Sequence, residues 1–573
     1  MSLEKMINKS ISYLINKQRP DGSIYDETDF DNLWSTAAYV ILLNHLGIDK
    51  KKDKLNEWII KNQNHDGSWG LDETNYFSLN FQDTLMALAA VDRNIDNNNL
   101  DAAKKWIETY TGEKQLSPYG EMFLSINDGD WDDIFHQNSS LILASFMLFN
   151  MPEKFGKILG KLQMKFPRLF SWSVYFYPLP WVSSAITPLQ LIFLLKSQKF
   201  GFIRKNLIKR MERKLLKDQL ENGSWFGISE FTLASIYALY ELGYGIDGSQ
   251  ISKGLNFLDS LIGVEGDLNT VQLPVWETSL AVISLLEAGI SPTDQVIENA
   301  VEFLKKTQMD HGGWPFSYSC HPDNDDTAYA ILALNKISSG NNNVKSVITK
   351  GIEFLSQMQN DDGSWSLYCK NQCHVKYKMG DEMWVDAGST DITGHVLQVL
   401  GETGNESSKS VKKAIKWLKD NQTDYGSWWG RWGLCYTYGT SCVLQGLKSV
   451  GVDPQSDYVL KAIDWLNETQ NSDGGWGEHH SSYYSETPVL GPSTVEQTSW
   501  ALSSLIDVNV PSDPEITETI KKGISFLGKI QREDGGFPSS YSAVSVSFCK
   551  YKLYSAVFPL LALSKFKKQL KEV

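Results

Sequence analysis

A seven-residue phrase recurs from one end of the chain to the other and limits the folds open to it. Two of its copies are Gln359-Asn-Asp-Asp-Gly-Ser-Trp365 and Gln470-Asn-Ser-Asp-Gly-Gly-Trp476. Related copies begin at Gln18, Gln63, Gln219, Gln308, Gln422 and Gln531. Each copy follows a stretch whose apolar residues have the spacing of an amphipathic helix, and most precede another stretch rich in Ala and Leu. Such self-similarity predicts helical hairpins stacked side by side.

The phrase itself has the chemistry of a connection between helices. Asp-Gly ends the first helix in a turn, where glycine tolerates a positive φ angle. The Trp can pack over this turn, and the Gln side-chain amide can bond free backbone groups at the end of a neighbouring helix. We therefore predict that the phrase has a structural role rather than one in substrate contact. A curved array of such hairpins that closes on itself is an α/α barrel.

Length and charge narrow the class of protein further. A chain of 573 residues is expected to form two large domains, and its formal net charge of −14 argues against nucleic acid as a partner. Its six cysteines form no dense framework, which indicates a reducing compartment. Cys369, Cys373 and His374 lack a second ligand pair at matching spacing, so no metal site is predicted.

Three carboxylates stand together in His321-Pro-Asp-Asn-Asp-Asp-Thr327, ahead of a predicted apolar helix over 327–334. Capping and the helix dipole would account for one or two acids at a helix start. Three acids beside an apolar face are a tighter coincidence. In a crowded cluster one carboxyl can keep its proton while its neighbours orient and polarise it, as the protonation of an alkene requires.

The repeated phrase and the sequence Asp-x-Asp-Asp-Thr together resemble the class II terpene cyclases of the squalene–hopene and oxidosqualene cyclase group. The resemblance covers nearly the whole chain and is densest from Val275 onward. It implies an all-α fold of two α/α barrels. Residues 1–29 and 286–573 would form the barrel that carries the acid motif, and residues 30–285 a second barrel inserted in the first. It also implies protonation-initiated cyclisation of a linear polyprenoid, for which no cofactor is required.

The resemblance also assigns roles to individual residues. It makes Asp325 the proton donor, with Asp323 and Asp326 as supporting carboxylates. The segment Ser389 to Leu397 matches the family segment that carries a histidine bonded to the acid, which implies that His395 is its partner. Asp391 precedes His395 by four residues and so shares a helix face with it, and we expect it to orient the imidazole.

A cationic cascade needs walls that stabilise positive charge and exclude water, and aromatic faces do both. The segment from Gly426 to Thr440 resembles the family's cavity-lining stretch. For any single aromatic residue, core packing is an equally good interpretation. The positions that the resemblance assigns to substrate binding are Trp181, Ile228, Phe316, Tyr368, Trp432, Tyr436, Tyr551 and Tyr554.

Three departures from the squalene cyclase pattern bear on the substrate. Only residues 197–206 separate two predicted helices where squalene cyclases carry a long insertion, and Gln308 runs directly to Gly312 without a Trp-bearing loop. Ala543 and Ser547 stand where those enzymes have phenylalanines. The sequence therefore favours a C15–C20 prenyl diphosphate that closes fewer rings. A squalene-like C30 or C35 hydrocarbon is the alternative, because the closest motif matches are to that branch.

A diphosphate substrate would need cations at the cavity mouth and would allow Mg²⁺ to bind. Arg168, Arg204 and Lys370 are the candidates, although a solvated surface position is favoured for each. The acidic run from Asp128 to Phe135 lacks the Asp-Asp-x-x-Asp pattern of class I ionisation, and a surface loop is expected there.

Two other classes of protein stay open at this stage. A protein prenyltransferase subunit shares the toroidal fold but needs zinc ligands that we cannot assemble, and a non-catalytic toroid could act as a scaffold. We predict a cytoplasmic protein without a secretory signal. The apolar stretch 169–202, interrupted by prolines, is expected to contact the inner membrane face peripherally. Whether the protein forms a homodimer is left open.

Overall fold

The computed structural model describes residues 2–29, 32–70, 77–91, 97–111, 180–196, 204–318, 320–338, 342–371, 386–508, 513–544 and 547–572. These residues are mostly helical, which confirms the predicted all-α class, and they belong to two compact units. One unit contains the described residues up to Thr28 and those from Leu273 onward; the other contains those between. The boundary predicted at 285/286 falls inside helix α14 (Pro274–Glu287), which packs as a whole against helices of the first unit.

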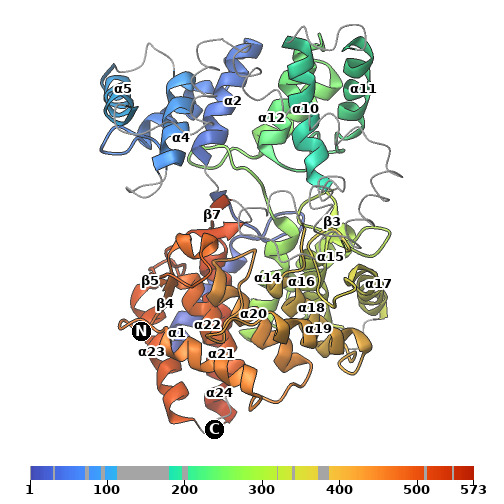
Figure 1. Cartoon of the computed structure of the whole chain (residues 1–573), viewed down its shortest axis with the longest axis vertical. Helices are drawn as coiled ribbons and strands as arrows, with labels where there is room; N and C mark the ends of the chain where they lie inside the picture. Colours follow the sequence, from blue (N-terminus) through green and yellow to red (C-terminus); the bar gives the residue numbers. More distant parts are fainter. Residues whose placement is uncertain are drawn as a thin grey trace. The chain divides into compact units, whose positions relative to one another are not determined.

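The first unit is built around six inner helices that form a closed ring (Figure 1). Each packs against the next, and the last returns to the first. The ring helices are α14, α16 (Asn324–Asn335), α18 (Thr390–Glu402), α20 (Cys435–Ser449), α22 (Val495–Val508) and α24 (Tyr554–Glu572). In α14 every residue from Pro274 to Leu285 is buried, because other elements cover it on all sides.

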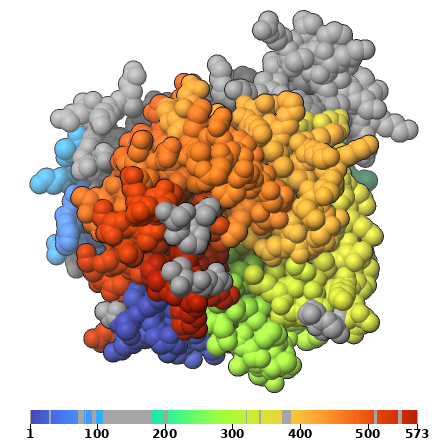
Figure 2. Space-filling model, turned by 90° about the horizontal axis from the view of Figure 1, so that it is seen from below, coloured from blue at the N-terminus to red at the C-terminus, as the bar shows by residue number. Residues whose placement is uncertain are grey.

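Six outer helices surround this ring, each against one inner helix. They are α15 (Gln295–Thr307), α17 (Asn342–Met358), α19 (Lys409–Asp420), α21 (Asp457–Glu468), α23 (Pro514–Ile530) and α1 (Leu3–Ile15). Only one face of each is buried, as their amphipathic sequences predict. Helix α1 completes the layer against α24. Figure 2 shows this N-terminal segment in dark blue, against the red C-terminal part of the chain.

The repeated phrase joins successive hairpins in the way that the sequence predicted. Gln359 Nε2 donates to the carbonyl of Gly363 in its own turn at 2.9 Å and to the carbonyl of Ser410 in the next outer helix at 3.0 Å. All eight glutamines make the equivalent pair of bonds. Their acceptors outside their own turns are the carbonyls of Val296, Asn99, Gln250, Val347, Ser410, Tyr458, Thr519 and Met6.

The Trp that ends the phrase binds in two directions. Trp365 Nε1 donates to the carbonyl of Leu355 at 2.8 Å, and its backbone amide donates to Thr393 Oγ1 of the next inner helix at 3.1 Å. The glycine is required as well. Gly363 has φ of +104°, and a Cβ atom there would lie 2.6 Å from the backbone carbonyl of Lys413. Each phrase is therefore a staple that fixes one hairpin to the next.

The second unit uses the same construction in its described parts. Its helices α2 (Asn32–Leu46), α4 (Phe77–Ala90), α10 (Pro180–Lys196) and α12 (Ser229–Glu241) pack in the order α4, α2, α12, α10. A second helix packs against each of them. These are α5 (Asn97–Thr111) against α4, α3 (Lys52–Lys61) against α2, α13 (Ser249–Ser260) against α12, and α11 (Arg204–Lys217) against α10. Staples at Gln63 and Gln219 link hairpins here too.

Short strands occupy the connections that lead into the inner helices. Antiparallel pairs are formed by β2 (Trp314–Pro315) with β3 (Pro322–Asp323), by β4 (Trp476–Glu478) with β5 (Leu490–Thr494), and by β6 (Ser542–Val544) with β7 (Ser547–Tyr551). The remaining short elements are β1 (Thr28–Asp29) and the 3₁₀ helix η3 (His480–Tyr484). Strand β3 leads directly into α16, so the acid motif begins at the entrance of an inner helix.

Candidate active site

The acid motif occupies the first turn of α16, earlier than the predicted helix start at Thr327. Asp323 caps the helix, and its Oδ1 accepts a hydrogen bond from the amide of Asp326 at 2.7 Å. Thr327 Oγ1 accepts from the amide of Trp314 at 2.9 Å, which is the staple bond of this repeat. Asp323, Asp325 and Asp326 are all buried. The motif is therefore fixed at both ends by the fold, with Asp325 between.

Asp325 lies against His395, the residue that the resemblance assigned to it as a partner. His395 Nδ1 lies 2.6 Å from Asp325 Oδ1, across the contact between the neighbouring helices α16 and α18. The other ring nitrogen, Nε2, lies 3.1 Å from Cys442 Sγ and 3.4 Å from the hydroxyl of Tyr329. The imidazole is thus held on both sides, in surroundings from which water is largely excluded.

Burial sets the ionisation of this cluster. It raises the pKa of Asp325, although the charge and hydrogen bond of His395 lower it in part. Burial raises the pKa of Asp323 to about 8, and burial together with the charge of Asp323 raises the pKa of Asp326 well above its usual range. Burial opposes the charged form of His395, but the fields of Tyr329, Cys442 and Asp325 raise its pKa overall. Burial therefore favours the neutral form of all three carboxyls.

Asp391 has a different role from the one expected. It lies on α18 one turn before His395, but its Oδ2 accepts from the amides of Arg431 at 2.9 Å and Trp432 at 2.8 Å. Its Oδ1 accepts from the amide of Ile392 at 3.0 Å and from the Ser389 hydroxyl. None of these bonds reaches His395. The shared helix face brings the two residues near each other, but the carboxylate is taken up by the 431–432 backbone.

Aromatic side chains connect the acid pair to two of the predicted wall residues. Tyr551 and Tyr554 are buried and stacked, with centroids 4.2 Å apart, and Trp276 Nε1 donates to the Tyr554 hydroxyl at 2.6 Å. Trp276 meets Tyr329 edge-on at 4.5 Å, and Tyr329 meets the imidazole of His395 edge-on at 4.7 Å. A continuous run of aromatic contacts therefore leads from Tyr551 to the acid's partner.

The other predicted wall residues divide between the two units. Phe316, Tyr368 and Trp432 are partly buried residues of the first unit, and Tyr436 there is buried, with its hydroxyl donating to the carbonyl of Ser485 at 2.8 Å.

Two predicted residues belong to the second unit. Trp181 stacks on Phe231 with centroids 6.3 Å apart, and Ile228 is the N-cap residue of α12.

The cationic candidates for a diphosphate have other partners or lie elsewhere. Arg204 donates from Nε to the carbonyl of Leu194 at 2.6 Å and from Nη2 to that of Leu195 at 2.9 Å, so it caps the end of α10. Lys370 is exposed and donates to the carbonyl of Gln357. Arg168, the acidic run 128–135, Cys373 and His374 lie outside the described residues.

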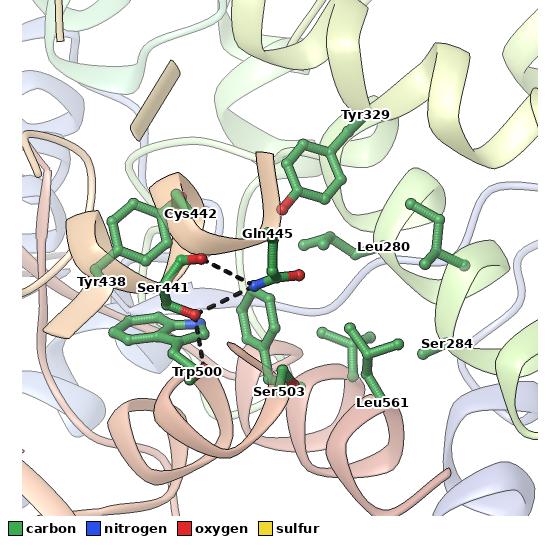
Figure 3. Close-up of a pocket in the computed structure, with 13 residues that line it drawn as sticks. Leu280, Ser284, Tyr329, Tyr438, Ser441, Cys442, Gln445, Trp500, Ser503 and Leu561 are labelled. Carbon is green, nitrogen blue, oxygen red and sulfur yellow. Dashed lines mark hydrogen bonds between the residues drawn. The ribbon is translucent and has the colours of Figure 1, made fainter. Parts of the chain in front are cut away.

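A small cavity of about 30 Å³ lies inside the ring, lined partly by Tyr329 and Cys442, the two partners of the imidazole (Figure 3). Gln445 Nε2 donates to Ser441 Oγ at 3.2 Å, and Ser441 Oγ donates to the carbonyl of Trp500. Trp500 Nε1, close to this network, is buried and has no hydrogen-bond partner among the described residues. The space and the unsatisfied donor suit at least one bound water molecule.

Sequence reasoning missed several residues around the acid. Tyr329 follows Asp325 by four residues on α16, so its position on the same helix face was available from the spacing. Trp276 and Cys442 gave no such signal. They come from α14 and α20, and only closure of the ring brings them to the imidazole.

The described residues contain no group of three or more His, Cys, Asp or Glu side chains that could hold a metal ion. Among the helices that the structure describes, none has both the length and the apolarity needed to cross a bilayer.

Comparison with known proteins identifies the family. Residues 272–568 match the squalene–hopene cyclase C-terminal domain, and residues 7–144 match its N-terminal domain. Squalene–hopene cyclase of Alicyclobacillus acidocaldarius subsp. acidocaldarius is 29% identical, over 98% of this chain and 97% of its own. Sporulenol synthase of Bacillus subtilis (strain 168) is 32% identical over 61% of this chain and 58% of its own.

A solved structure supports the same fold. The ent-copalyl diphosphate synthase of Streptomyces platensis superimposes with a TM-score of 0.61 over 98% of this chain and 99% of its own, at 16% identity. The chain belongs to the squalene–hopene cyclase family and is an enzyme of the class II terpene cyclase type.

Proposed function

We propose that Asp325 protonates the terminal double bond of a linear polyprenoid and so starts a cationic cyclisation. The observation that carries the proposal is the buried contact of 2.6 Å between Asp325 Oδ1 and His395 Nδ1. A charged imidazole at this oxygen stabilises the carboxylate left behind, which makes the carboxyl a stronger acid. Burial keeps competing water away from it.

The proposed steps involve only protons and π electrons. The alkene π pair forms a C–H bond with the Asp325 proton as the O–H bond breaks, and the negative charge stays on the carboxylate beside His395. Each following alkene then gives its π pair to the cation and forms a C–C bond. Aromatic faces such as those of Tyr551 and Tyr554 would stabilise the positive charge through their quadrupoles.

For the substrate we propose a C15–C20 prenyl diphosphate. One support is the short connection between α10, which ends at Lys196, and α11, which begins at Arg204. The other is that Gln308 leads directly into its staple turn without an inserted loop. Mg²⁺ would accompany the diphosphate group. No step at Asp325 uses it, and the described residues gather no three ligands for it.

A C30 or C35 hydrocarbon is the second candidate. It is favoured by the relative from Alicyclobacillus acidocaldarius, a squalene–hopene cyclase whose likeness to this chain extends over nearly its full length. The copalyl diphosphate synthase structure shares the fold of this chain. Because cyclases for either substrate class would have this fold, that structure does not favour one candidate over the other.

Product analysis by gas chromatography–mass spectrometry tests both points. Wild type and Asp325→Asn are incubated in parallel with farnesyl diphosphate, geranylgeranyl diphosphate and squalene, with phosphatase treatment before extraction. We expect cyclic product from wild type and a loss on the order of 10³-fold in the variant, because the proton donor is gone. The substrate that is consumed identifies the chain length.

Asp362→Asn is the matched control. Asp362 accepts from the amide of Ser364 in a staple turn, and Asn222 makes the same bond in another repeat, so this exchange should leave both fold and activity intact. Equal product from Asp325→Asn and Asp362→Asn would sink the assignment of Asp325. Linear recovery of all three substrates with wild type would contradict the proposed substrates.

We also propose peripheral contact with an anionic membrane surface through α10 and α11. Lys205, Lys209, Arg213 and Lys217 recur every fourth residue on α11 and are all exposed, so they form one basic stripe. Leu189 of the adjacent apolar helix α10 is 54% exposed. A basic stripe and an exposed apolar side chain on two adjacent helices suit the boundary between lipid headgroups and acyl chains.

A further inference from the structure

Three buried carboxylates each bind the backbone of a segment that carries one predicted wall residue. Asp386 Oδ2 accepts from the amide of Tyr368 at 2.6 Å. Asp391 Oδ2 accepts from the amide of Trp432 at 2.8 Å, and Glu478 Oε2 accepts from the amide of Tyr436 at 3.2 Å. In all three cases the bond is to the amide of the aromatic residue itself. We call Asp386, Asp391 and Glu478 the amide clamps.

Each clamp also binds at least one neighbouring amide, so a short run of backbone is fixed rather than one atom. Asp386 accepts from Leu367 at 3.0 Å and from Cys369 at 2.7 Å. Asp391 accepts from Arg431 at 2.9 Å, and Glu478 accepts from Thr437 at 2.5 Å. A carboxylate has about four lone-pair sites, which is why one side chain can hold two or three N–H groups.

Two of the clamps are joined to each other and to the acid motif. Arg431 donates its amide to Asp391, while its buried guanidinium lies 3.6 Å from Asp386. The segment that Asp386 holds is bonded in turn to Asn324, whose amide donates to the carbonyl of Leu367 at 2.9 Å and whose side chain donates to that of Ser366 at 2.7 Å. Asn324 directly precedes Asp325, so the clamped segment and the proton donor share one framework.

We infer that the amide clamps are positioning residues that fix the aromatic wall against the growing cation, an inference that rests on the proposed function. Cation–π attraction depends on where the cation sits over the ring, and it weakens as the distance grows. Loop segments are mobile unless their backbone groups are bound. Holding each aromatic residue by its own amide fixes the origin of its side chain, so loosening a clamp lets the cation be quenched before the last ring closes.

The alternative is that the clamps serve folding alone, as Glu478 does in part by binding amides in the first turn of α20. A purely structural role would change stability without changing what the enzyme makes. The ratio of incompletely to fully cyclised product separates the two, because it compares molecules that have all been protonated by a folded enzyme.

The test measures this ratio for Asp386→Asn and Glu478→Gln with whichever of farnesyl diphosphate, geranylgeranyl diphosphate or squalene the wild type converts. Both exchanges keep side-chain volume and one acceptor oxygen. We expect the ratio to rise by roughly a factor of ten, the effect of losing one hydrogen bond to a charged group. KM should change little, since the substrate itself is not contacted.

Glu496→Gln is the matched control. Glu496 is a buried carboxylate that accepts from the amide and hydroxyl of Ser540 and holds no predicted wall residue. Its product ratio should equal that of wild type, whatever its melting temperature.

Clamp variants that also keep the wild-type ratio would overturn the inference. So would loss of folding in both clamp variants while Glu496→Gln folds, because the clamps would then act on stability. A wild type that yields no cyclic product would instead refute the proposed function itself.

Discussion

At the scale of single residues, the acid motif combines two kinds of position. Asp326 stands directly before the staple threonine, as Glu277 and Gln497 do in other repeats. A buried polar side chain therefore recurs at this position, although Phe231 and Ile392 occupy it in two other repeats. Asp325, one residue earlier, turns to His395 instead. Glu230, Asp391 and Glu496 also stand two residues before a staple threonine, so the catalytic proposal depends on what Asp325 contacts and not on an added carboxyl.

The ionisation of Asp323 predicts how kcat depends on pH. Asp323 has a pKa raised to about 8, so near neutral pH it is largely protonated, and as pH rises through 8 it becomes charged beside Asp325. A new negative charge there makes Asp325 a weaker acid. We expect kcat to fall above about pH 8 and to vary little below it, as measured from pH 5.5 to 9.5.

Asp323→Asn provides the comparison for this profile, because asparagine still accepts the capping hydrogen bond from Asp326. Its kcat should lose the descent at pH 8. An identical descent in this variant would assign the limb to another group. The stability of the fold also decreases as pH rises. The pKa of Asp323 is about 3.9 in the unfolded chain and about 8 in the folded one, so between these values the native state binds more protons than the unfolded state.

At the scale of elements, the staple is the unit that repeats. The glutamine bridges two carbonyls, the tryptophan reaches back to its own hairpin, and the threonine of the next inner helix accepts the tryptophan amide. Helix ends have unpaired carbonyls and amides, and the staple satisfies several of them at once. It therefore stabilises the boundaries between hairpins, where an array of short helices is weakest.

Gln359→Ala should destabilise the protein by about 1–3 kcal/mol, because two buried carbonyls would each lose a donor. The measurement is the free energy of unfolding from urea titration of the two proteins. Gln357→Ala is the control, since this glutamine is exposed two residues away and lies outside the staple. Equal losses in the two variants would show that the bridging bonds contribute nothing specific.

At the scale of the whole molecule, the first unit is a ring whose two ends meet. Helix α1 occupies an outer position beside α24, and Gln531 donates to the carbonyl of Met6 at 3.1 Å. Every inner helix therefore has two inner neighbours, and the acid pair lies at one of these contacts, between α16 and α18. Charge is also distributed unevenly, since a chain of net charge −14 carries a basic stripe on α11.

Co-sedimentation with vesicles tests whether that stripe matters. We expect binding to phosphatidylglycerol-containing vesicles and not to pure phosphatidylcholine, weakening as salt is raised. Replacing Lys205, Lys209, Arg213 and Lys217 together by Ala should cost several kcal/mol of binding, at about 1 kcal/mol per basic residue near the surface.

The matched control for the vesicle experiment is a quadruple Ala variant of exposed lysines on α19, such as Lys409, Lys412, Lys413 and Lys416. It removes the same charge from the other unit. Equal losses in both variants would show general electrostatics rather than a docking stripe.

The sequence by itself determined the repeating hairpins and the staples. These depend on local spacing and on a motif whose parts lie close together in the chain, such as Gln359 and Trp365. The fold class followed, because hairpins joined in one way can stack in few ways. Helix starts were less certain: α16 begins at Asn324, since Asp323 caps it.

Only the tertiary structure decided what surrounds the acid and what holds the wall. Cys442 and Trp276 reach the imidazole because ring closure turns faces of α20 and α14 toward it, and the sequence has no period that predicts this. Asp391 was expected to orient His395, yet its carboxylate binds the 431–432 backbone, because those amides lie within reach once α18 and α20 pack together. Hydrogen-bond partners far apart in the chain are selected by distance in the folded protein, which spacing along the sequence does not encode.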